Sequence, residues 1–379
     1  MNLELTEQQR MIRDQVREFA RKEVAPGAAD RDVTEEFPTE ILEKMGKLGL
    51  LGIMIPKEYG GAGLDAVSYA VTVEEISRAC AATGVITSVH NSFAGYMIHK
   101  WGTEEQKRKY IPKLASGEVL GAFAGTEPNA GSDLGAMQTT AVLDGDNYIV
   151  NGTKTFITAG SRSGIVIIFA ITDKDAGPKG ISAFIVESSF KGYQVGPIFD
   201  KMGIRASETS ELIFEDMEVP KENLLGNEGE GFKIALASID GGRIGIASQA
   251  VGIAQAALDE AIAYSKQRIQ FGKPIAKFQA IQWMIAEMAT RIEASRLLVY
   301  QAATLKDKGV RFSRESAMAK LMAGETAVWC ADRAIQIHGG YGYMRDHKVE
   351  RLFRDAKITE IYEGTSEVQK MVIASTLLK

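Results

Sequence analysis

The chain has 379 residues, of which 45% are hydrophobic and 25% are charged, the balance of a globular protein rather than a disordered or fibrous one. Its 44 basic and 49 acidic residues give a formal net charge of -5 without a long block of either sign, which argues against nucleic acid as a partner. Cys80 and Cys330 stand apart from each other and from any Cys/His cluster. The sequence therefore suggests no disulfide framework and no metal site, and a reducing compartment fits best.

The first 119 residues predict a helical domain. Thr6 and Gln9 have the spacing of a capping box, and apolar residues then recur at helical intervals as far as Pro26. Further helices are expected at about 38–48, 65–80 and 103–110. The start of the chain lacks the apolar core of a signal peptide, and the longest apolar run, 164–171, is far shorter than the roughly 20 residues of a spanning helix. We therefore expect a cytoplasmic protein that does not enter a membrane.

Residues 120–228 predict a β domain. Asp144 and Gly145 form a strong hairpin signal between two short β-branched runs. Strands are expected at 139–143, 148–150, 165–171, 181–186 and 211–214. This pattern favours a compact antiparallel sheet or a small barrel.

Residues 229–379 return to helical spacing. Apolar or small residues from Ile281 to Val299 step by alternating four and three positions, as in neighbouring helices of a bundle. A helical domain, then a sheet, then a bundle is not the order of a doubly wound nucleotide-binding fold. The chain also has no GxGxxG, so any dinucleotide must be bound without a Rossmann phosphate turn.

Three local patterns are candidates for a site, and each has an ordinary reading when taken alone. The loop 125–133 could be a surface turn, and the glycines at 339–342 could simply end a helix beside a structural histidine. Glu363 lies between Tyr362 and Gly364, and most glutamates are solvated. A glutamate in apolar surroundings, however, can have a raised pKa and act as a base toward a carbon acid.

Taken together and in order, six segments resemble the acyl-CoA dehydrogenase family along the whole chain. They are 126–133, 156–158, 240–255, 268–275, 336–343 and 354–369. The resemblance implies a mostly α protein with a central β domain, made of an N-terminal helical domain, a small antiparallel β-barrel or sandwich and a C-terminal four-helix bundle. It also implies FAD as cofactor, a homotetramer and an electron-transferring flavoprotein as electron acceptor.

Carried over to this chain, the resemblance implies three groups of site residues. The flavin ring and its surroundings would be contacted by Phe123, Thr126, Ser132, Phe156, Ile157 and Thr158. The rest of FAD would be held, partly from a neighbouring subunit, by Arg268, Phe271, Gln279, Gln336, Gly339 and Gly340, with Thr365 and Glu367 also near the cofactor. Acyl-CoA would be contacted by Ser132, Asp240, Arg243 and Gly364.

The mechanism implied by the resemblance is an α,β-dehydrogenation of the thioester. Glu363 would remove the α proton while the β hydride passes to the flavin, and the carbonyl oxygen would accept hydrogen bonds from a ribityl hydroxyl and the Glu363 N–H. Some relatives carry the base at the position that is Gly242 here, so Glu363 is the only matching base, which disfavours the isovaleryl and long-chain branches. Residues 84–87 supply no arginine before Ser88 and Val89, which disfavours a dicarboxylic substrate.

The substrate is left more open than the reaction. The chain resembles bacterial short-chain, butyryl-CoA type members, and a branched or alicyclic (cyclohexane-carboxyl type) acyl group is the alternative. Asn91 could line the acyl pocket, or it could cap a helix or meet water. A catalytically silent acyl-CoA or FAD binding protein, or a helical assembly module, are the alternatives from another class.

Overall fold

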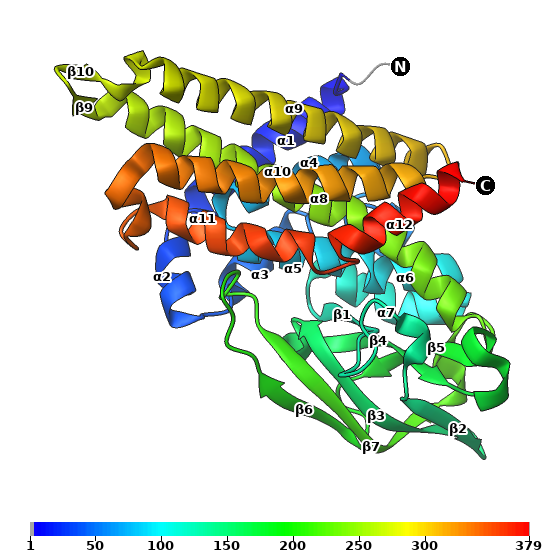
Figure 1. Cartoon of the computed structure of the whole chain (residues 1–379). Coiled ribbons are helices and arrows are strands. Elements are labelled where there is room, and N and C mark those ends of the chain that lie inside the picture. Colours follow the sequence, from blue (N-terminus) through cyan, green and yellow to red (C-terminus); the bar gives the residue numbers. More distant parts are fainter. Residues whose placement is uncertain (1–3, 379) are drawn as a thin grey trace.

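The computed structural model describes residues 4–378 (Figure 1). The N-terminal helices pack against one side of the long C-terminal helices, and the β domain lies below both. The N-terminal domain contains α1 (Glu7–Phe19), α2 (Ala28–Thr34), α3 (Thr39–Lys47), α4 (Ala66–Ala79), α5 (Ala81–Ser92), α6 (Ala94–Trp101) and α7 (Glu104–Ser116).

Local signals fix the ends of two of these helices. The capping boxes of α1 and α7 both form: the Thr6 and Thr103 hydroxyls accept from the N–H groups of Gln9 and Gln106, whose side chains accept in return. The predicted end of α7 at Tyr110 is wrong, because the helix continues through Pro112 to Ser116. Burial of Ile111, Leu114 and Ala115 outweighs the hydrogen bond that a proline cannot donate.

The β domain is a mixed sheet. Its strands are β1 (Leu120–Ala124), β2 (Thr140–Asp144), β3 (Asn147–Thr158), β4 (Ser163–Ile171), β5 (Ile181–Glu187), β6 (Tyr193–Ile198), β7 (Thr209–Pro220) and β8 (Leu224–Leu225). Their order is β6-β7-β3-β2-β4-β5-β8, with β1 also paired to β4. The predicted hairpin forms where Asp144 pairs with Asn147, but the β1–β4 pair and the single β2–β4 pair are parallel, so the sheet is not purely antiparallel.

Strand β4 explains the long apolar run at 164–171. Ile165, Ile167 and Phe169 join the core shared with the helices, whereas Val166 and Ile168 join a separate core inside the β domain. Both faces of the strand are therefore buried, which removes the alternation that one wet face would give. No helix within residues 4–378 is long and apolar enough to cross a membrane.

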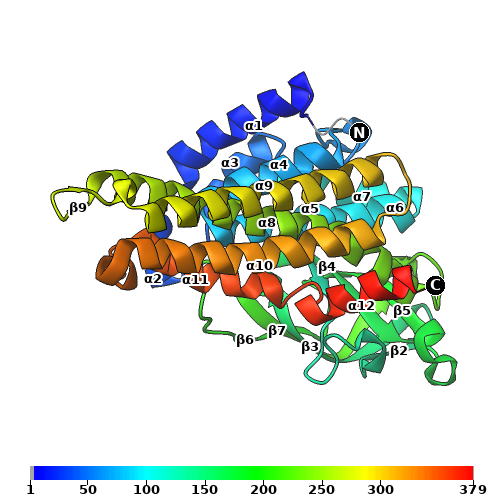
Figure 2. The ribbon, with the colours of Figure 1, turned by 45° about the horizontal axis from the view of Figure 1, so that its top comes forward.

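The C-terminal part is a bundle of long helices lying side by side (Figure 2). It contains α8 (Gly231–Gln267), α9 (Gln279–Asp307) and α10 (Ser313–His338), with the small hairpin β9 (Ile269–Gln270) and β10 (Lys273–Pro274) between α8 and α9. Two shorter helices, α11 (Lys348–Lys357) and α12 (Ser366–Leu377), follow each other along α10. The turn that joins α11 to α12 faces the β domain and carries Glu363.

Candidate active site

The turn between α11 and α12 has an unusual backbone. Glu363 has φ 52° and Gly364 has φ 94°, so two successive residues have left-handed φ values. Glycine tolerates such a φ, whereas a residue with a side chain rarely adopts it. Thr365 ends the turn by capping α12, its hydroxyl accepting from the Val368 N–H at 3.3 Å.

Neighbouring elements hold this turn from two sides. The Gly364 carbonyl accepts from Lys320 Nζ at 2.7 Å and from Gln369 Nε2 at 2.8 Å. The Tyr362 hydroxyl donates to the side chain of Gln249 on α8, which in turn donates to the Ala81 carbonyl at 2.9 Å. The strained residue is therefore fixed by contacts on both sides of it.

The carboxylate of Glu363 is buried and has no partner. Both of its oxygens are inaccessible and make no hydrogen bond within the described part of the chain. Burial raises the pKa of Glu363 to about 8, although the charges of Lys320 and Arg243 act in the opposite direction. Arg243 is itself buried and donates to Asp240 at 2.7 Å, while its Nε is left without a partner. A carboxylate of this kind is a base that titrates near neutral pH.

Gly242 supplies the space in which this carboxylate lies. A Cβ at position 242 would lie 2.3 Å from Glu363 Oε2 and 2.7 Å from the Phe93 ring. The Phe93 ring in turn packs on Phe123 at a centroid distance of 4.5 Å, and Phe123 lies against Gly125 at the start of the next loop. Glu363 is thus connected through two aromatic rings to the loop that contains Thr126 and Ser132.

A buried ion pair holds that loop against the sheet. Glu127 accepts from Lys154 Nζ at 2.7 Å and also from the N–H groups of Gln138 and Thr139 at 2.6 and 3.1 Å. The Thr126 carbonyl accepts from the Thr155 N–H at 2.9 Å. The two ends of the loop are therefore tied to each other and to β3, and Ser132 is exposed between them.

The segment 156–158 continues from this loop along β3. Ile157 is buried and Thr158 is half-buried, whereas the Phe156 side chain is 64% exposed. Phe156 has φ 57° and its ring lies on that of Phe199 at 5.0 Å. An aromatic ring held outward in a rare backbone conformation is available to an external planar group.

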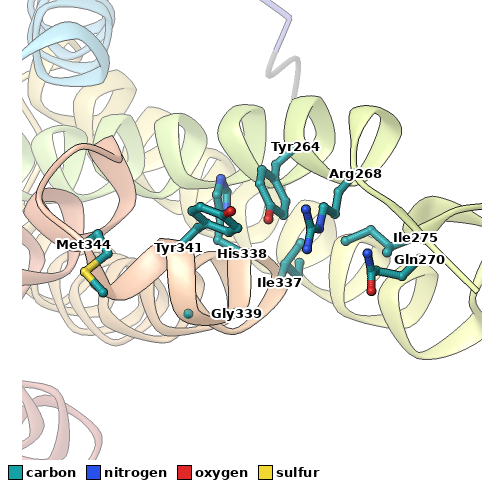
Figure 3. A pocket seen from close by; sticks show the side chains of 10 residues that line it. Tyr264, Arg268, Gln270, Ile275, Ile337, His338, Gly339, Tyr341 and Met344 are labelled. Atoms are coloured by element: carbon teal, nitrogen blue, oxygen red, sulfur yellow. The ribbon is translucent and has the colours of Figure 1, made fainter.

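The second predicted cofactor group gathers around a cleft at the other end of the bundle (Figure 3). The cleft has a volume of about 520 Å³, and Arg268, Gly339 and Gly340 are among its lining residues. A Cβ at either glycine would meet nothing within 4 Å, and Arg268 makes no ion pair with any residue of 4–378 but lies over the Tyr341 ring at 5.5 Å. Phe271, 93% exposed, and the exposed Gln279 and Gln336 lie near the same end.

The structure does not bring the two predicted cofactor groups together within one chain. In both views the β9–β10 end of the bundle lies far from the β domain (Figures 1 and 2). Thr365 and Glu367, at the start of α12, follow Glu363 by two and four positions, next to the turn that faces the β domain. The cleft at Arg268 therefore belongs to a different surface from the turn that carries the base.

Asn91 has contacts that differ from those of a pocket residue. Its amide nitrogen donates to the Leu50 and Thr87 carbonyls, both at 3.0 Å, and its oxygen accepts from the Ile53 N–H at 3.0 Å. Both N–H bonds are thus used by the backbone, and the side chain is buried. These contacts do not support Asn91 as a substrate residue, and the structure gives it the role of joining α5 to the 50–53 segment.

Lys320, Gln369 and Lys154 were not predicted as site residues. Lys320 is an isolated charge among small residues of α10, and that is the one signal that the sequence offered. Gln369 and Lys154 resemble ordinary surface residues in sequence, and their contacts arise only when α12 and β3 are packed.

Comparison with known proteins agrees with this arrangement over the full length. The family models for the acyl-CoA dehydrogenase N-terminal, middle and C-terminal domains match residues 6–118, 122–217 and 229–378. The short-chain specific acyl-CoA dehydrogenase of Clostridium acetobutylicum is 55% identical over 379 residues, covering 100% of both chains.

Solved structures give the same result. Butyryl-CoA dehydrogenase from Megasphaera elsdenii is 46% identical with a TM-score of 0.98, and each chain is covered completely. A chain of the structure solved for the electron transferring flavoprotein of Acidaminococcus fermentans is 53% identical with a TM-score of 0.99, again with 100% of both chains covered. The protein belongs to the acyl-CoA dehydrogenase family.

Proposed function

We propose that the protein oxidises a short-chain acyl-CoA thioester to its 2-enoyl-CoA, with Glu363 as the base. The observation that carries this proposal is the buried Glu363 carboxylate, which has no hydrogen-bond partner among residues 4–378 and whose pKa is raised to about 8 by burial. An α proton of a thioester needs a base that is desolvated and correctly placed. The names of the short-chain specific and butyryl-CoA relatives support a small acyl group.

FAD is the cofactor of this family, and the residues present fit it. The open pair Gly339 and Gly340 lets a ligand approach the backbone closely. Arg268 beside them, which forms no ion pair within residues 4–378, has a guanidinium that suits a pyrophosphate. When bound, FAD supplies the acceptor for the β hydride. Its ring would contact Phe123, Thr126, Ser132, Phe156, Ile157 and Thr158, and its remainder would contact Arg268, Phe271, Gln279, Gln336, Gly339, Gly340, Thr365 and Glu367.

Residues of this chain would bind and activate the thioester. Glu363 takes the α proton, and its own N–H, which makes no hydrogen bond within residues 4–378, donates to the thioester oxygen as negative charge develops there. Arg243, beside Asp240, has an Nε that no described residue occupies and that would donate to the CoA portion, while Ser132 and Gly364 complete the contacts. The aromatic rings of Phe93 and Phe123 exclude water from the side of Gly242.

We also propose a homotetramer in which each cofactor is shared between two subunits. The support is the distance within one chain between the Arg268 cleft and the Phe156 surface, which would both contact FAD. Exposed Phe271 suits a subunit contact, because so exposed an aromatic ring costs hydration free energy.

The electron acceptor is proposed to be an electron-transferring flavoprotein. The support is the 53% identity to a chain in a structure of such a flavoprotein, and the exposure of Phe156 beside the proposed flavin position. Electron transfer to this partner, rather than rapid peroxide formation in air, is the expected behaviour.

A panel of thioesters under anaerobic conditions tests the function. The purified protein should be yellow, and butyryl-CoA should bleach it faster than palmitoyl-CoA, with branched and cyclohexane-carboxyl thioesters included to decide among small acyl groups. The Glu363→Gln variant should stay yellow and react on the order of a thousandfold more slowly, about 4 kcal/mol in barrier. Normal bleaching of that variant would place the base elsewhere, and a colourless protein that ignores added FAD would indicate a silent scaffold.

A further inference from the structure

Lys320 lies inside the bundle without an acidic partner. It is 1% exposed, on the face of α10 that packs small residues such as Ala317 and Ala323. Its Nζ donates to the Gly364 carbonyl at 2.7 Å and forms no ion pair with any described residue. A buried ammonium without a carboxylate costs stability, so an uncharged residue would pack here more favourably. Its position next to the base suggests a functional reason for this cost.

We propose that Lys320 is a positioning residue for Glu363, which fixes the turn in its left-handed form and supplies the positive charge that keeps the buried carboxylate able to ionise. This inference rests on the proposed role of Glu363 as the base. It assigns two separable tasks to one side chain, a hydrogen bond and a charge.

The hydrogen bond acts on the backbone of the turn. Left-handed backbone at Glu363 costs on the order of 1 kcal/mol or more and persists only when its surroundings enforce it. Lys320 and Gln369 donate to the same Gly364 carbonyl, and Gln369 also approaches the Glu363 carbonyl at 3.4 Å. The two donors orient the peptide that follows the base, and thereby the direction of its side chain.

The charge acts on the carboxylate through a region that excludes water. Arg243 on α8 is the other cation near Glu363, but it is bonded to Asp240, which cancels part of its field. Lys320 makes no ion pair with any described residue, although the charges of Glu360 and Glu367 also act on it, so less of its field than that of Arg243 is cancelled by a direct contact. Burial lowers the pKa of Lys320 to about 8, against the effect of Glu363 that raises it, which leaves the ammonium charged at neutral pH.

The other titratable groups around this pair have partners, lie at the surface or are neutral. Glu360 is bonded to Lys357 at 2.6 Å, and Glu367 on α12 lies on the exposed side. The pKa values of Tyr69 on α4 and of Tyr362 are raised by burial, so both hydroxyls stay neutral over the pH range in question. The pH response of Glu363 is therefore governed mainly by burial, Lys320 and the Arg243–Asp240 pair.

Four variants separate the two tasks. Lys320→Met removes the hydrogen bond and the charge, Lys320→Arg keeps the charge, and Gln369→Leu removes a donor to Gly364 but no charge. Lys348→Met is the control, because Lys348 is a half-buried lysine on α11 that contacts Glu260 rather than the turn. All four are compared as flavoproteins with similar FAD content.

The measurement is the anaerobic rate of flavin bleaching by butyryl-CoA as a function of pH. With Lys320→Met the acidic limb of the pH–rate profile should move to higher pH by roughly one unit, because a nearby opposite charge shifts a carboxyl pKa by about that amount. At a given pH on that limb the rate should then be about tenfold slower. In Lys320→Arg and Lys348→Met the acidic limb should lie at the same pH as in the wild type. Gln369→Leu should lower the rate but leave the pH of the acidic limb unchanged. Infrared detection of the protonated Glu363 carboxyl, by difference from Glu363→Gln, should give the same shift without turnover.

An unmoved limb in Lys320→Met would overturn the inference while leaving the proposed function intact, since the wild-type protein would still bleach and Glu363→Gln would not. If Lys320→Met does not accumulate, Lys320→Gln provides the same comparison with an uncharged donor. An unmoved limb there contradicts the role of the charge in the same way.

Discussion

Gly242 shows how closely single atoms are fitted around the base. In Gly242→Ala the new methyl group would lie 2.3 Å from Glu363 Oε2, so the carboxylate or the Phe93 ring must move. Displacement of a base by about an ångström is expected to lower the rate about a hundredfold. The neighbouring change Gly241→Ala is the control, because its methyl group would meet only the end of the Lys306 side chain, at 3.2 Å, and not the base. Equal rates in the two variants would contradict this role of Gly242.

The raised pKa of Glu363 also predicts that the free energy of unfolding falls as the pH rises. Its pKa is about 8 in the folded protein and 4.5 ordinarily, so the unfolded chain loses this proton first as the pH rises. The contribution of Glu363 to stability is therefore complete below about pH 4.5 and is lost as the pH rises through 8. Glu363→Gln should be about as stable as the wild type at pH 5 and more stable by a few kcal/mol at pH 8. Urea unfolding at the two pH values measures this difference, and an equal difference at both would refute it.

At the scale of an element, the loop 126–139 depends on the buried Glu127–Lys154 pair. Burial alone would raise the pKa of Glu127, but Lys154 and the loop N–H groups lower it below its usual value. Lys154→Met leaves that carboxylate buried and unpaired, and should cost about 3 to 5 kcal/mol in the free energy of unfolding and weaken FAD retention. Lys191→Met, which breaks the exposed pair with Glu218 in the same domain, should cost less than about 1 kcal/mol.

A double variant tests whether the pair or the packing is responsible. Glu127→Gln combined with Lys154→Met removes the unpaired charge and should recover part of the lost stability. If the double variant loses more stability than the two single variants lose together, the ion pair is not the cause.

The sequence predicted the elements whose signals are local. The capping boxes at Thr6 and Thr103, and the hairpin at Gly145, depend on residues a few positions apart. Helices α5 and α6 were not predicted. Helix α5 is buried on all sides, so it has no solvent-exposed face whose polar residues would reveal helical spacing. At the site, Glu363 stood in a recognisable motif, whereas the contact of Lys320 with Gly364 joins residues 44 positions apart and depends on how α10 packs.

At the scale of the whole molecule, the separation of the two cofactor surfaces predicts complementation between damaged subunits. Arg268→Ala and Phe156→Ala should each weaken FAD retention in a pure assembly. In a mixed assembly, one site of each pair combines intact Arg268 from one subunit with intact Phe156 from the other, and that site should bind FAD normally. Subunits are mixed after dissociation and FAD is measured by absorbance. If each FAD lay within one chain, mixing would restore no FAD binding. The proposed tetramer is measured separately by light scattering, which should give about four times 41.2 kDa for the intact assembly.

The overlap of Gly242 with the Glu363 carboxylate also constrains how such a site can evolve. A glutamate gained at position 242 while Glu363 is present would have its Cβ 2.3 Å from Glu363 Oε2, so the two side chains cannot both keep this arrangement. The base can move between these two positions only if the older carboxylate is lost first, through an ancestor with no base at all.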